Sequence, residues 1–245
     1  MNDDIQVWQI PLQVSLKTVD GYLACLGEDE ILRANRFKFP DDRRRFVVAR
    51  GALRHLLGNH IGKAPAGIEF GYGEYGKPFV RQAFTAQLGP AGSLDILPHE
   101  AFQFNLSHSG DLAVCGLGRH RKIGIDIEKI RSIGRLEMMM ERCLSAAEQV
   151  LVKAARLEDQ SQLFLEYWTC KEAYLKATGL GLTQSMQRVE IAASRLVHVP
   201  DDCAEGWQLH SIAVPEGYIA ALVVAGTADT RTDVPVKAWS HPDFA

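Results

Sequence analysis

The sequence has no long apolar run, no secretion-type leader and no paired cysteine motif. No apolar stretch approaches the roughly 18 residues that a membrane-spanning helix needs. Residues 1–10 carry Asp3 and Asp4 instead of a basic segment, which does not fit a signal peptide. The five cysteines are widely spaced and none forms C-x-x-C, which excludes a zinc ribbon and a disulfide framework. We therefore expect a cytoplasmic protein without a membrane segment.

An excess of basic residues is also missing. Lys and Arg number 27 against 30 Asp and Glu, for a net charge of −3. A general nucleic-acid binder needs a strong basic excess, so that class is excluded and any anion site must be a local cluster. The 245 residues, 47% of them apolar, suit one large domain or two halves that share a core.

The periodicity of apolar residues predicts helices and strands in each half of the chain. Helices are expected at 28–36, 41–60, from 146 onward after the Ser145–Glu148 capping box, and at 161–178 before Gly179. Strands are expected at 5–10, 68–72, 79–81, 102–106, 112–117, 123–130, 187–191, 207–214 and 218–224, with a turn at 107–111 and a loop at 85–100. This order indicates an α+β fold. The two halves resemble each other weakly, because each ends with a strand of small residues.

The segment Gly124–Glu128 is the most informative strand. Residues two apart on a strand share a face, so Asp126 and Glu128 project together. Two adjacent carboxylates suit a cation between them, and oxygen ligands suit Mg²⁺. A polar edge facing water explains the same pattern equally well.

The segment Trp168–Lys176 is predicted to be helical, which places Glu172 and Lys176 four residues apart on one face. Glu172 is a candidate third metal ligand, and Lys176 lies one turn beyond it. Taken alone, the pair is better explained as an ordinary ion pair on a helix surface.

Three segments are candidates for phosphate binding. The segment Asn105–Gly110, at the end of a predicted strand, offers hydroxyls, backbone N–H groups and an imidazole, although taken alone it is better explained as a polar turn. Residues 33–54 hold seven arginines, of which we expect two or three to touch a ligand. The tight turn Tyr75–Pro78 could bring its backbone against a flat ring, although by itself it is only a turn.

The order of these motifs carries more information than any one of them. Gly76-Lys77-Pro78, Phe104–Ser109, Gly124–Glu128 and Trp168–Lys176 follow one another in a pattern that resembles the surfactin-synthetase-type 4′-phosphopantetheinyl transferases. The resemblance spans roughly residues 30 to 182. It implies two similar α+β halves in one chain, a pseudo-dimer, with coenzyme A bound at their junction. We place the halves at 1–118 and 119–245.

The resemblance also implies roles for individual residues. Asp126, Glu128 and Glu172 would hold Mg²⁺ with the pyrophosphate of coenzyme A, and Lys176 would stabilise the leaving group. Contacts to coenzyme A are expected from Arg45, Arg50, Lys77, Pro78, Ser107 and His108, with His108 and Arg45 near the 3′-phosphate. For the base that accepts the serine proton, Glu172 is the first candidate, Glu148 the second and a metal-bound water the third.

The partner implied by the resemblance is an apo-carrier protein of the acyl, polyketide or peptidyl kind. Residues 129–144 directly follow the Asp126–Glu128 strand and contain three consecutive methionines, so we expect an acidic carrier to dock there. Core packing explains those apolar side chains at least as well. A chain with both halves need not oligomerise, so a monomer is expected. A Mg²⁺-dependent nucleotide phosphohydrolase and a non-catalytic coenzyme A- or carrier-binding module remain alternatives.

Overall fold

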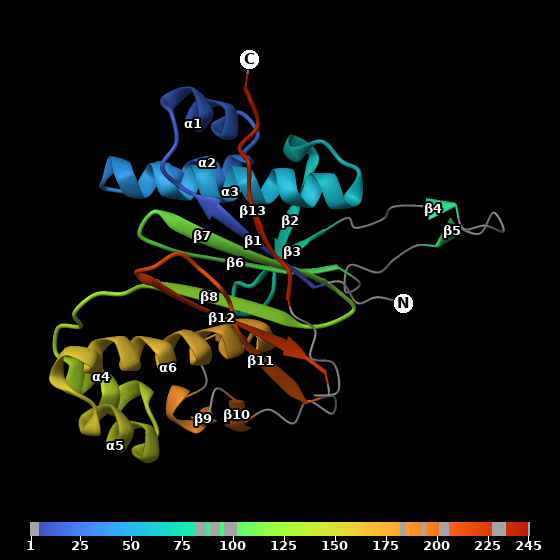
Figure 1. Ribbon diagram of the computed structural model, residues 1–245. Coiled ribbons are helices and arrows are strands. Elements are labelled where there is room, and N and C mark those ends of the chain that lie inside the picture. The colour runs from blue at the N-terminus through green and yellow to red at the C-terminus, as the bar shows by residue number, and fades with distance from the viewer. Residues whose placement is uncertain are drawn as a thin grey trace.

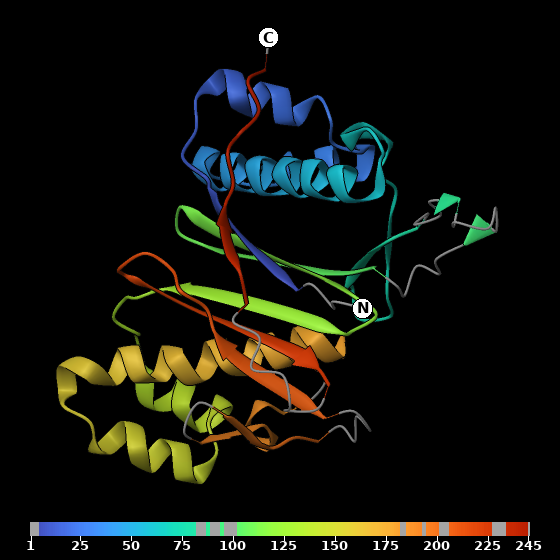
Figure 2. The same ribbon diagram turned by 45° about the vertical axis from the view of Figure 1, so that its right-hand side comes forward.

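Two sheets lie face to face at the centre of the molecule, and each carries helices on its outer side (Figure 1; Figure 2). The structure is a computed structural model that describes residues 5–81, 87–88, 94–95, 102–181, 185–192, 195–200, 206–226 and 234–244. The layers follow the order helices, sheet, sheet, helices. The α+β fold in two halves is thereby confirmed. Among the described residues, no helix combines the length and apolar character that a bilayer crossing requires.

The N-terminal half builds the upper sheet and its helices. Its elements are β1 (Gln6–Pro11), α1 (Leu16–Leu23), α2 (Glu28–Ala34), α3 (Pro40–Ile61), β2 (Phe70–Tyr72), β3 (Pro78–Val80), β4 (Gln87–Leu88), β5 (Leu94–Asp95), β6 (Phe102–Ser109) and β7 (Leu112–Arg119). The sheet has the order β13-β1-β7-β6, in which β13 (Val236–Ala238) comes from the C-terminal half and β6 lies at one edge.

The C-terminal half builds the lower sheet and its helices. Its elements are β8 (Ile123–Lys129), α4 (Leu136–Cys143), α5 (Ala146–Ala154), α6 (Leu157–Thr178), β9 (Glu190–Ala192), β10 (Arg195–His198), β11 (Trp207–Ser211), β12 (Tyr218–Ala225) and β13 (Val236–Ala238). The sheet has the order β11-β12-β8, which places β8 at an edge.

Local chemistry explains where the long helices begin and end. Pro40 opens α3, and Asp41 and Asp42 complement the positive end of its dipole. Its predicted apolar face is buried at Phe46, Ala49, Leu53, Leu56 and Leu57. The predicted capping box is confirmed, since Ser145 accepts from the Glu148 backbone N–H while the Glu148 carboxylate accepts from the Ser145 N–H.

Apolar side chains fill the space between the two sheets. Val7 and Val114 from the upper sheet meet Ile125 and Leu222 from the lower one, and all four are fully or almost fully buried. Separate apolar clusters fill the space under α1–α3 and under α4–α6. The layer between the sheets holds the halves together, so the edges β6 and β8 have a fixed relation to each other.

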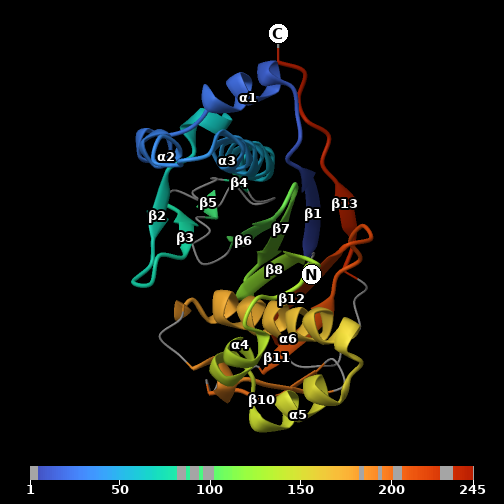
Figure 3. The same cartoon turned by 90° about the vertical axis from the view of Figure 1, so that its left-hand side faces the viewer.

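The last described segment returns to the N-terminal half (Figure 3). Strand β13 pairs parallel to β1. Beyond it, the Trp239 indole Nε1 donates to the Tyr22 hydroxyl at 2.9 Å, and that hydroxyl lies 2.7 Å from Nδ1 of His241. This link between residues more than two hundred positions apart was not predicted from the sequence.

Several predicted boundaries were wrong. The turn expected at 107–111 is shorter, because β6 continues to Ser109 and Gly110, with φ of 56°, makes the reversal with Asp111. Helix α6 begins at Leu157, before the expected 161, and β10 and β13 were missed. The loop expected at 85–100 contains the short strands β4 and β5, and its other residues lie outside the described part of the chain.

Candidate active site

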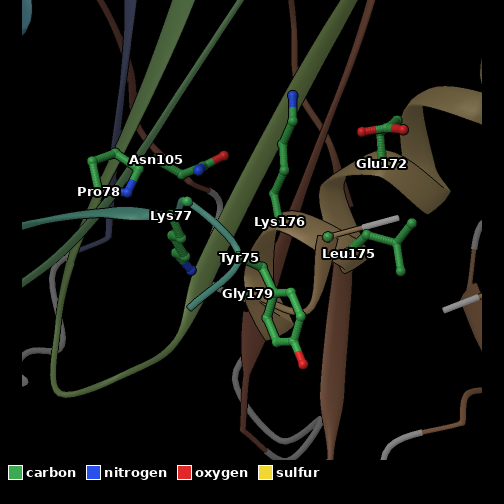
Figure 4. Close-up of a pocket in the computed structure, with 10 residues that line it drawn as sticks. Tyr75, Lys77, Pro78, Asn105, Glu172, Leu175, Lys176 and Gly179 are labelled. Carbon is green, nitrogen blue, oxygen red and sulfur yellow. The ribbon is translucent and has the colours of Figure 1, made fainter. Parts of the chain in front are cut away.

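A pocket of about 210 Å³ opens where the two halves meet. Figure 4 shows Tyr75, Lys77 and Pro78 on one side of it and Glu172 and Lys176, from α6, on another. The lining residues are Tyr75, Gly76, Lys77, Pro78, Asn105, Glu172, Leu175, Lys176, Gly179 and Gly181. Three of the four sequence motifs therefore line this pocket directly, and the fourth lies next to it through Asp126.

Gly124 sets the position of α6 against β8. A Cβ atom built on Gly124 would lie 2.1 Å from the Ala173 carbonyl oxygen and 2.2 Å from the Ala177 backbone nitrogen. Only glycine lets the strand and helix backbones approach this closely. The contact brings Glu172 and Lys176 of the helix beside Asp126 of the strand.

Asp126 is the buried centre of this arrangement, with 4% of its surface exposed. Its Oδ1 accepts from the Lys176 ammonium at 2.5 Å and from the Ser107 hydroxyl at 2.7 Å. Its Oδ2 is buried and has no hydrogen-bond partner among the described residues. Burial raises the pKa of Asp126, while the neighbouring Lys176 works in the opposite direction.

Two further carboxylates lie near Asp126. Glu128 follows it on the same face of β8 and accepts through Oε2 from the Ser109 hydroxyl at 2.9 Å and from Arg131 at 2.8 Å. Burial raises the pKa of Glu172, Lys176 lowers it, and the other two carboxylates raise it further. The three carboxylates expected together thus influence one another electrostatically.

Lys77 joins the turn of the N-terminal half to the C-terminal half. Its ammonium donates to the carbonyls of Ile123 at 2.9 Å and Ala177 at 3.1 Å. The second carbonyl lies at the C-terminal, negative end of α6. Burial lowers the pKa of Lys77 to about 8. The Lys77 side chain therefore links the two halves and also lines the pocket.

The basic residues expected near a phosphate are divided between two places. His108 is exposed on the face of β6 opposite Ser107, and partial loss of water, followed by Lys176 and Arg45, lowers its pKa. Arg45 itself donates to Asp111 and Asp42, each at 3.0 Å. These residues lie at the turn end of β6.

Arg50 and Glu148 are bound elsewhere. Arg50 donates to the buried Glu30 at 2.6 Å and lies over the Phe70 ring, inside the N-terminal half. Both oxygens of Glu148 are occupied, one by the Ile191 N–H and the other by the Ser145 N–H and the Lys171 ammonium. Neither residue lines the pocket.

Sequence analysis grouped Asn105 and Ser109 with a phosphate-binding candidate and did not predict that both side chains bind β8. Asn105 accepts through Oδ1 from the Ile125 backbone N–H at 2.9 Å, and Ser109 binds Glu128. Both share a face with Ser107, because they are two residues away on the strand. The signal was present as alternation at 105, 107 and 109, but the predicted turn at 107 hid it.

The donor set suits a hard, oxygen-preferring cation. No three His, Cys, Asp or Glu side chains in the described ranges already converge as a metal cage. Mg²⁺ does not need one, since one or two carboxylates and substrate phosphates complete its shell. Asp126 offers a buried oxygen without a partner, next to Glu128 on the same face of the strand. The residues present therefore fit the expected ion.

Known proteins resemble the chain along most of its length. A family model for the 4′-phosphopantetheinyl transferase superfamily matches residues 122–223, and one for the N-terminal region of 4′-phosphopantetheinyl transferases matches 12–117. The chain is 36% identical to the 4′-phosphopantetheinyl transferase HetI of Nostoc sp. PCC 7120, over 92% of this chain and 90% of that one. It is 29% identical to a 4′-phosphopantetheinyl transferase of Bacillus subtilis, over 92% and 87%. Identity to Sfp of Bacillus subtilis strain 168 is 24%, over 91% and 86%.

Proposed function

The chain belongs to the 4′-phosphopantetheinyl transferase superfamily, and from that premise we propose that its junction pocket is the active site. The enzyme transfers the 4′-phosphopantetheine group of coenzyme A to a serine of an apo-carrier protein, which leaves 3′,5′-ADP. The observation that carries the assignment of the site is the convergence of Asp126, Lys176 and Glu172 at one pocket between the halves. Family membership also favours the transferase over the phosphohydrolase and the binding module.

Coenzyme A would lie along the pocket with its nucleotide toward the N-terminal half. Lys77 and Pro78 line the pocket, and the glycine turn gives a flat ring close access to the backbone. We propose that His108 and Arg45 meet the 3′-phosphate, because they are the basic side chains at the turn end of β6. Arg50 would have to leave Glu30 to reach the substrate, so we leave it out of this site.

Asp126 and Glu128 would hold a divalent cation, with Glu172 beside them. The support is the buried, unpartnered Oδ2 of Asp126 and the three mutually interacting carboxylates. When bound, Mg²⁺ would neutralise the pyrophosphate and the charge that develops on it. Lys176 now balances the charge of Asp126, and we propose that it turns to the phosphates when coenzyme A enters.

The residues of the pocket supply the remaining chemistry. The carrier serine oxygen forms a bond to the β-phosphorus, and the bond to the bridging oxygen of 3′,5′-ADP breaks. Glu172 takes the serine proton, because its carboxylate lines the pocket beside Lys176 and can face a serine that enters it. Lys176 stabilises the negative charge on the leaving group. Ser107 is expected to act through its bond to Asp126.

Glu148 has a different place in this scheme. Its carboxylate caps α5 and binds the fully buried Lys171, which is next to Glu172 on α6. A base needs an oxygen free to receive a proton, and both oxygens of Glu148 are occupied. We therefore propose that Glu148 positions α6 and does not accept the serine proton.

The carrier would dock on the segment 129–144, as expected from the sequence. Ile133, Leu136 and Met140 border a surface pocket of about 510 Å³ that α6 and α5 complete. Of the methionine run, Met138 is exposed and Met140 is buried, so only part of the run is open for contact. Arg135 is exposed beside the pocket and suits an acidic partner. We propose that the enzyme acts as a monomer, because both halves of the site come from one chain.

Charge reversal at Arg135 tests this docking surface. Arg135→Glu should raise KM for the carrier severalfold and leave KM for coenzyme A unchanged. Arg131 is unsuitable for this test because it binds Glu128. Lys17→Glu, at an exposed residue of α1 in the N-terminal half and away from this surface, is the matched control. An unchanged KM for the carrier would remove this surface from the scheme.

Intact mass spectrometry of a purified apo-carrier tests the proposed reaction as a whole. After incubation with the enzyme, coenzyme A and Mg²⁺, the carrier should gain one phosphopantetheine, and a chelator should abolish the gain. Chelator-resistant transfer would overturn the metal proposal. Release of 3′,5′-ADP without any modified carrier would support a hydrolase instead.

A further inference from the structure

Polar side chains join the two sheet edges beside the site. Strand β6 ends the upper sheet and β8 ends the lower one, and the two strands are not neighbours in either sheet of the described chain. Side chains bridge them instead, at three alternate residues of β6: Asn105, Ser107 and Ser109. Asn105 accepts from the Ile125 backbone N–H and fixes the register of the two edges. We call these three residues the edge ladder.

The hydrogen of the Ser107 hydroxyl has a defined direction. The Lys176 ammonium lies 2.9 Å from this oxygen and can only donate to it. The hydroxyl hydrogen is then left for Oδ1 of Asp126, at 2.7 Å. One oxygen of the carboxylate is thus held, while Oδ2 has no partner.

Ser109 repeats this arrangement two residues later. The Lys129 backbone N–H, at 3.0 Å, can only donate to the Ser109 oxygen. The hydroxyl hydrogen therefore points to Oε2 of Glu128, at 2.9 Å. Arg131 binds the same Oε2 from the solvent side, and Oε1 takes part in none of these bonds. Each serine thus receives an N–H and directs its O–H to one oxygen of a carboxylate.

From this repeated geometry we propose that the edge ladder positions the two carboxylates of β8, with Ser109 as the positioning residue for Glu128. Fixing one oxygen of each carboxylate leaves the other turned to the place where the cation and pyrophosphate meet. The N-terminal half thereby contributes to the cation site without supplying a ligand. The inference rests on the proposed function, in which Asp126 and Glu128 hold the cation.

Loss of one such hydrogen bond should weaken cation binding without abolishing it. Removal of partners that orient metal ligands typically costs about 10- to 100-fold in metal affinity. Ser107 is a poor test because it also contacts Lys176. Among the described residues, the Ser109 hydroxyl hydrogen-bonds only to Glu128 and to a backbone N–H, so its substitution isolates the effect.

The experiment measures binding of Mn²⁺ by the loss of its free-ion electron paramagnetic resonance signal, with coenzyme A present and no carrier. Ser109→Ala should raise the dissociation constant about tenfold, and Ser109→Thr, which keeps the hydroxyl, should restore it. Ser211→Ala, at an exposed serine of β11, is the matched control and should bind as the wild type does. Should the alanine variant fail to fold, Ser109→Cys keeps the size with a weaker donor and should show the same direction.

Glu128→Gln separates the two ways in which this account can fail. Where Glu128→Gln weakens Mn²⁺ binding and Ser109→Ala does not, the positioning role is overturned while the cation site stands. Where Glu128→Gln binds Mn²⁺ as the wild type does, Glu128 is no ligand, and the proposed site and this inference fall together. A lower melting temperature of Ser109→Ala with unchanged Mn²⁺ affinity would reduce the ladder to a structural contact.

Discussion

The helices α3 and α6 are counterparts in the two halves of the molecule. Each has 22 residues, and each ends before a glycine in the left-handed conformation. Each covers the outer face of one central sheet (Figure 1). A common scaffold thus places a long helix behind each edge strand of the junction.

The polar side chains of the two helices are used in opposite ways. On α3, Arg50 and Arg54 bind the buried Glu30 and stabilise the N-terminal half. On α6, Glu172 and Lys176 line the pocket. The contact of α6 with Gly124 of β8 puts its side chains at the junction. The two similar helices therefore have different roles, since the arginines of α3 bind within the N-terminal half whereas Glu172 and Lys176 of α6 line the pocket.

Removal of a pocket carboxylate should have the largest effect on the reaction rate, and it tests the difference between the two helices most directly. Glu172→Ala should lower the rate of carrier modification by at least about 100-fold, because the site loses a cation-facing carboxylate and the proposed base. The chain should stay folded, since burial of that carboxylate is a cost. Stopped-time mass spectrometry and circular dichroism check both points.

Glu166→Ala is the matched control on the same helix. Glu166 contacts Gln162 and does not line the pocket, so its loss should leave the rate nearly unchanged. Equal losses in the two variants would contradict a special role for Glu172.

A side chain at Gly124 should push α6 off its strand. Gly124→Ala places a Cβ about 2 Å from two backbone atoms of the helix, and overpacking of this kind costs about 3 kcal/mol or more of unfolding free energy. Gly134→Ala, where a Cβ meets nothing within 4 Å, should be nearly neutral. Chemical denaturation of both variants measures the difference. Equal stabilities would mean that α6 does not depend on this contact.

The sequence predicted the elements that carry the site better than it predicted the site itself. Strand β8 and helix α6 were identified because alternation and helical spacing are local properties, and the Ser145–Glu148 cap has an equally local signature. The α+β fold in two halves was expected from the family resemblance. The candidates at Asp126, Glu128 and Glu172 interact electrostatically, although in the described ranges their side chains do not converge as a ready-made metal cage.

Long-range contacts explain what was missed. Glu148 was the second candidate for the base, but its carboxylate binds Lys171, which only the packing of α5 against α6 brings near. Ser109 was assigned to a turn because Gly110 suggested an early reversal, whereas pairing with β7 extends the strand. The return of β13 to β1 joins opposite ends of the chain, and a short strand of this kind has no local signature.

The segment after β13 binds the N-terminal half through Trp239 and His241, and Tyr22→Phe tests how much this contact stabilises the protein. The Tyr22 hydroxyl is bound by Trp239 and His241, so its removal leaves both without their partner. The loss should be about 1–3 kcal/mol of unfolding free energy. Tyr75→Phe, at an exposed tyrosine, should change stability by less than about 0.5 kcal/mol. If calorimetry showed equal shifts in melting temperature for the two variants, this role for the segment would be contradicted.

The bridge that Lys77 makes between the halves should make the stability of the protein depend on pH. Below about pH 8 Lys77 is protonated in both the folded and the unfolded chain, and folding bears the cost of burying the ammonium. Between about pH 8 and its ordinary pKa of 10.5, only the unfolded chain keeps the proton, so stability rises with pH. Wild type should therefore gain stability relative to Lys77→Met across this range, as denaturation at several pH values can show. If the unfolding free energies of the wild type and of Lys77→Met changed with pH in the same way, the lowered pKa of Lys77 would be contradicted.

The central claim is that the cation and coenzyme A meet between the halves, on the carboxylates of β8 and α6. Anomalous diffraction from crystals grown with Mn²⁺ and coenzyme A tests it most directly. The account predicts one strong peak bounded by Asp126, Glu128 and Glu172, in contact with the pyrophosphate. A peak elsewhere, or coenzyme A bound away from the pocket at Lys77 and Lys176, would contradict it.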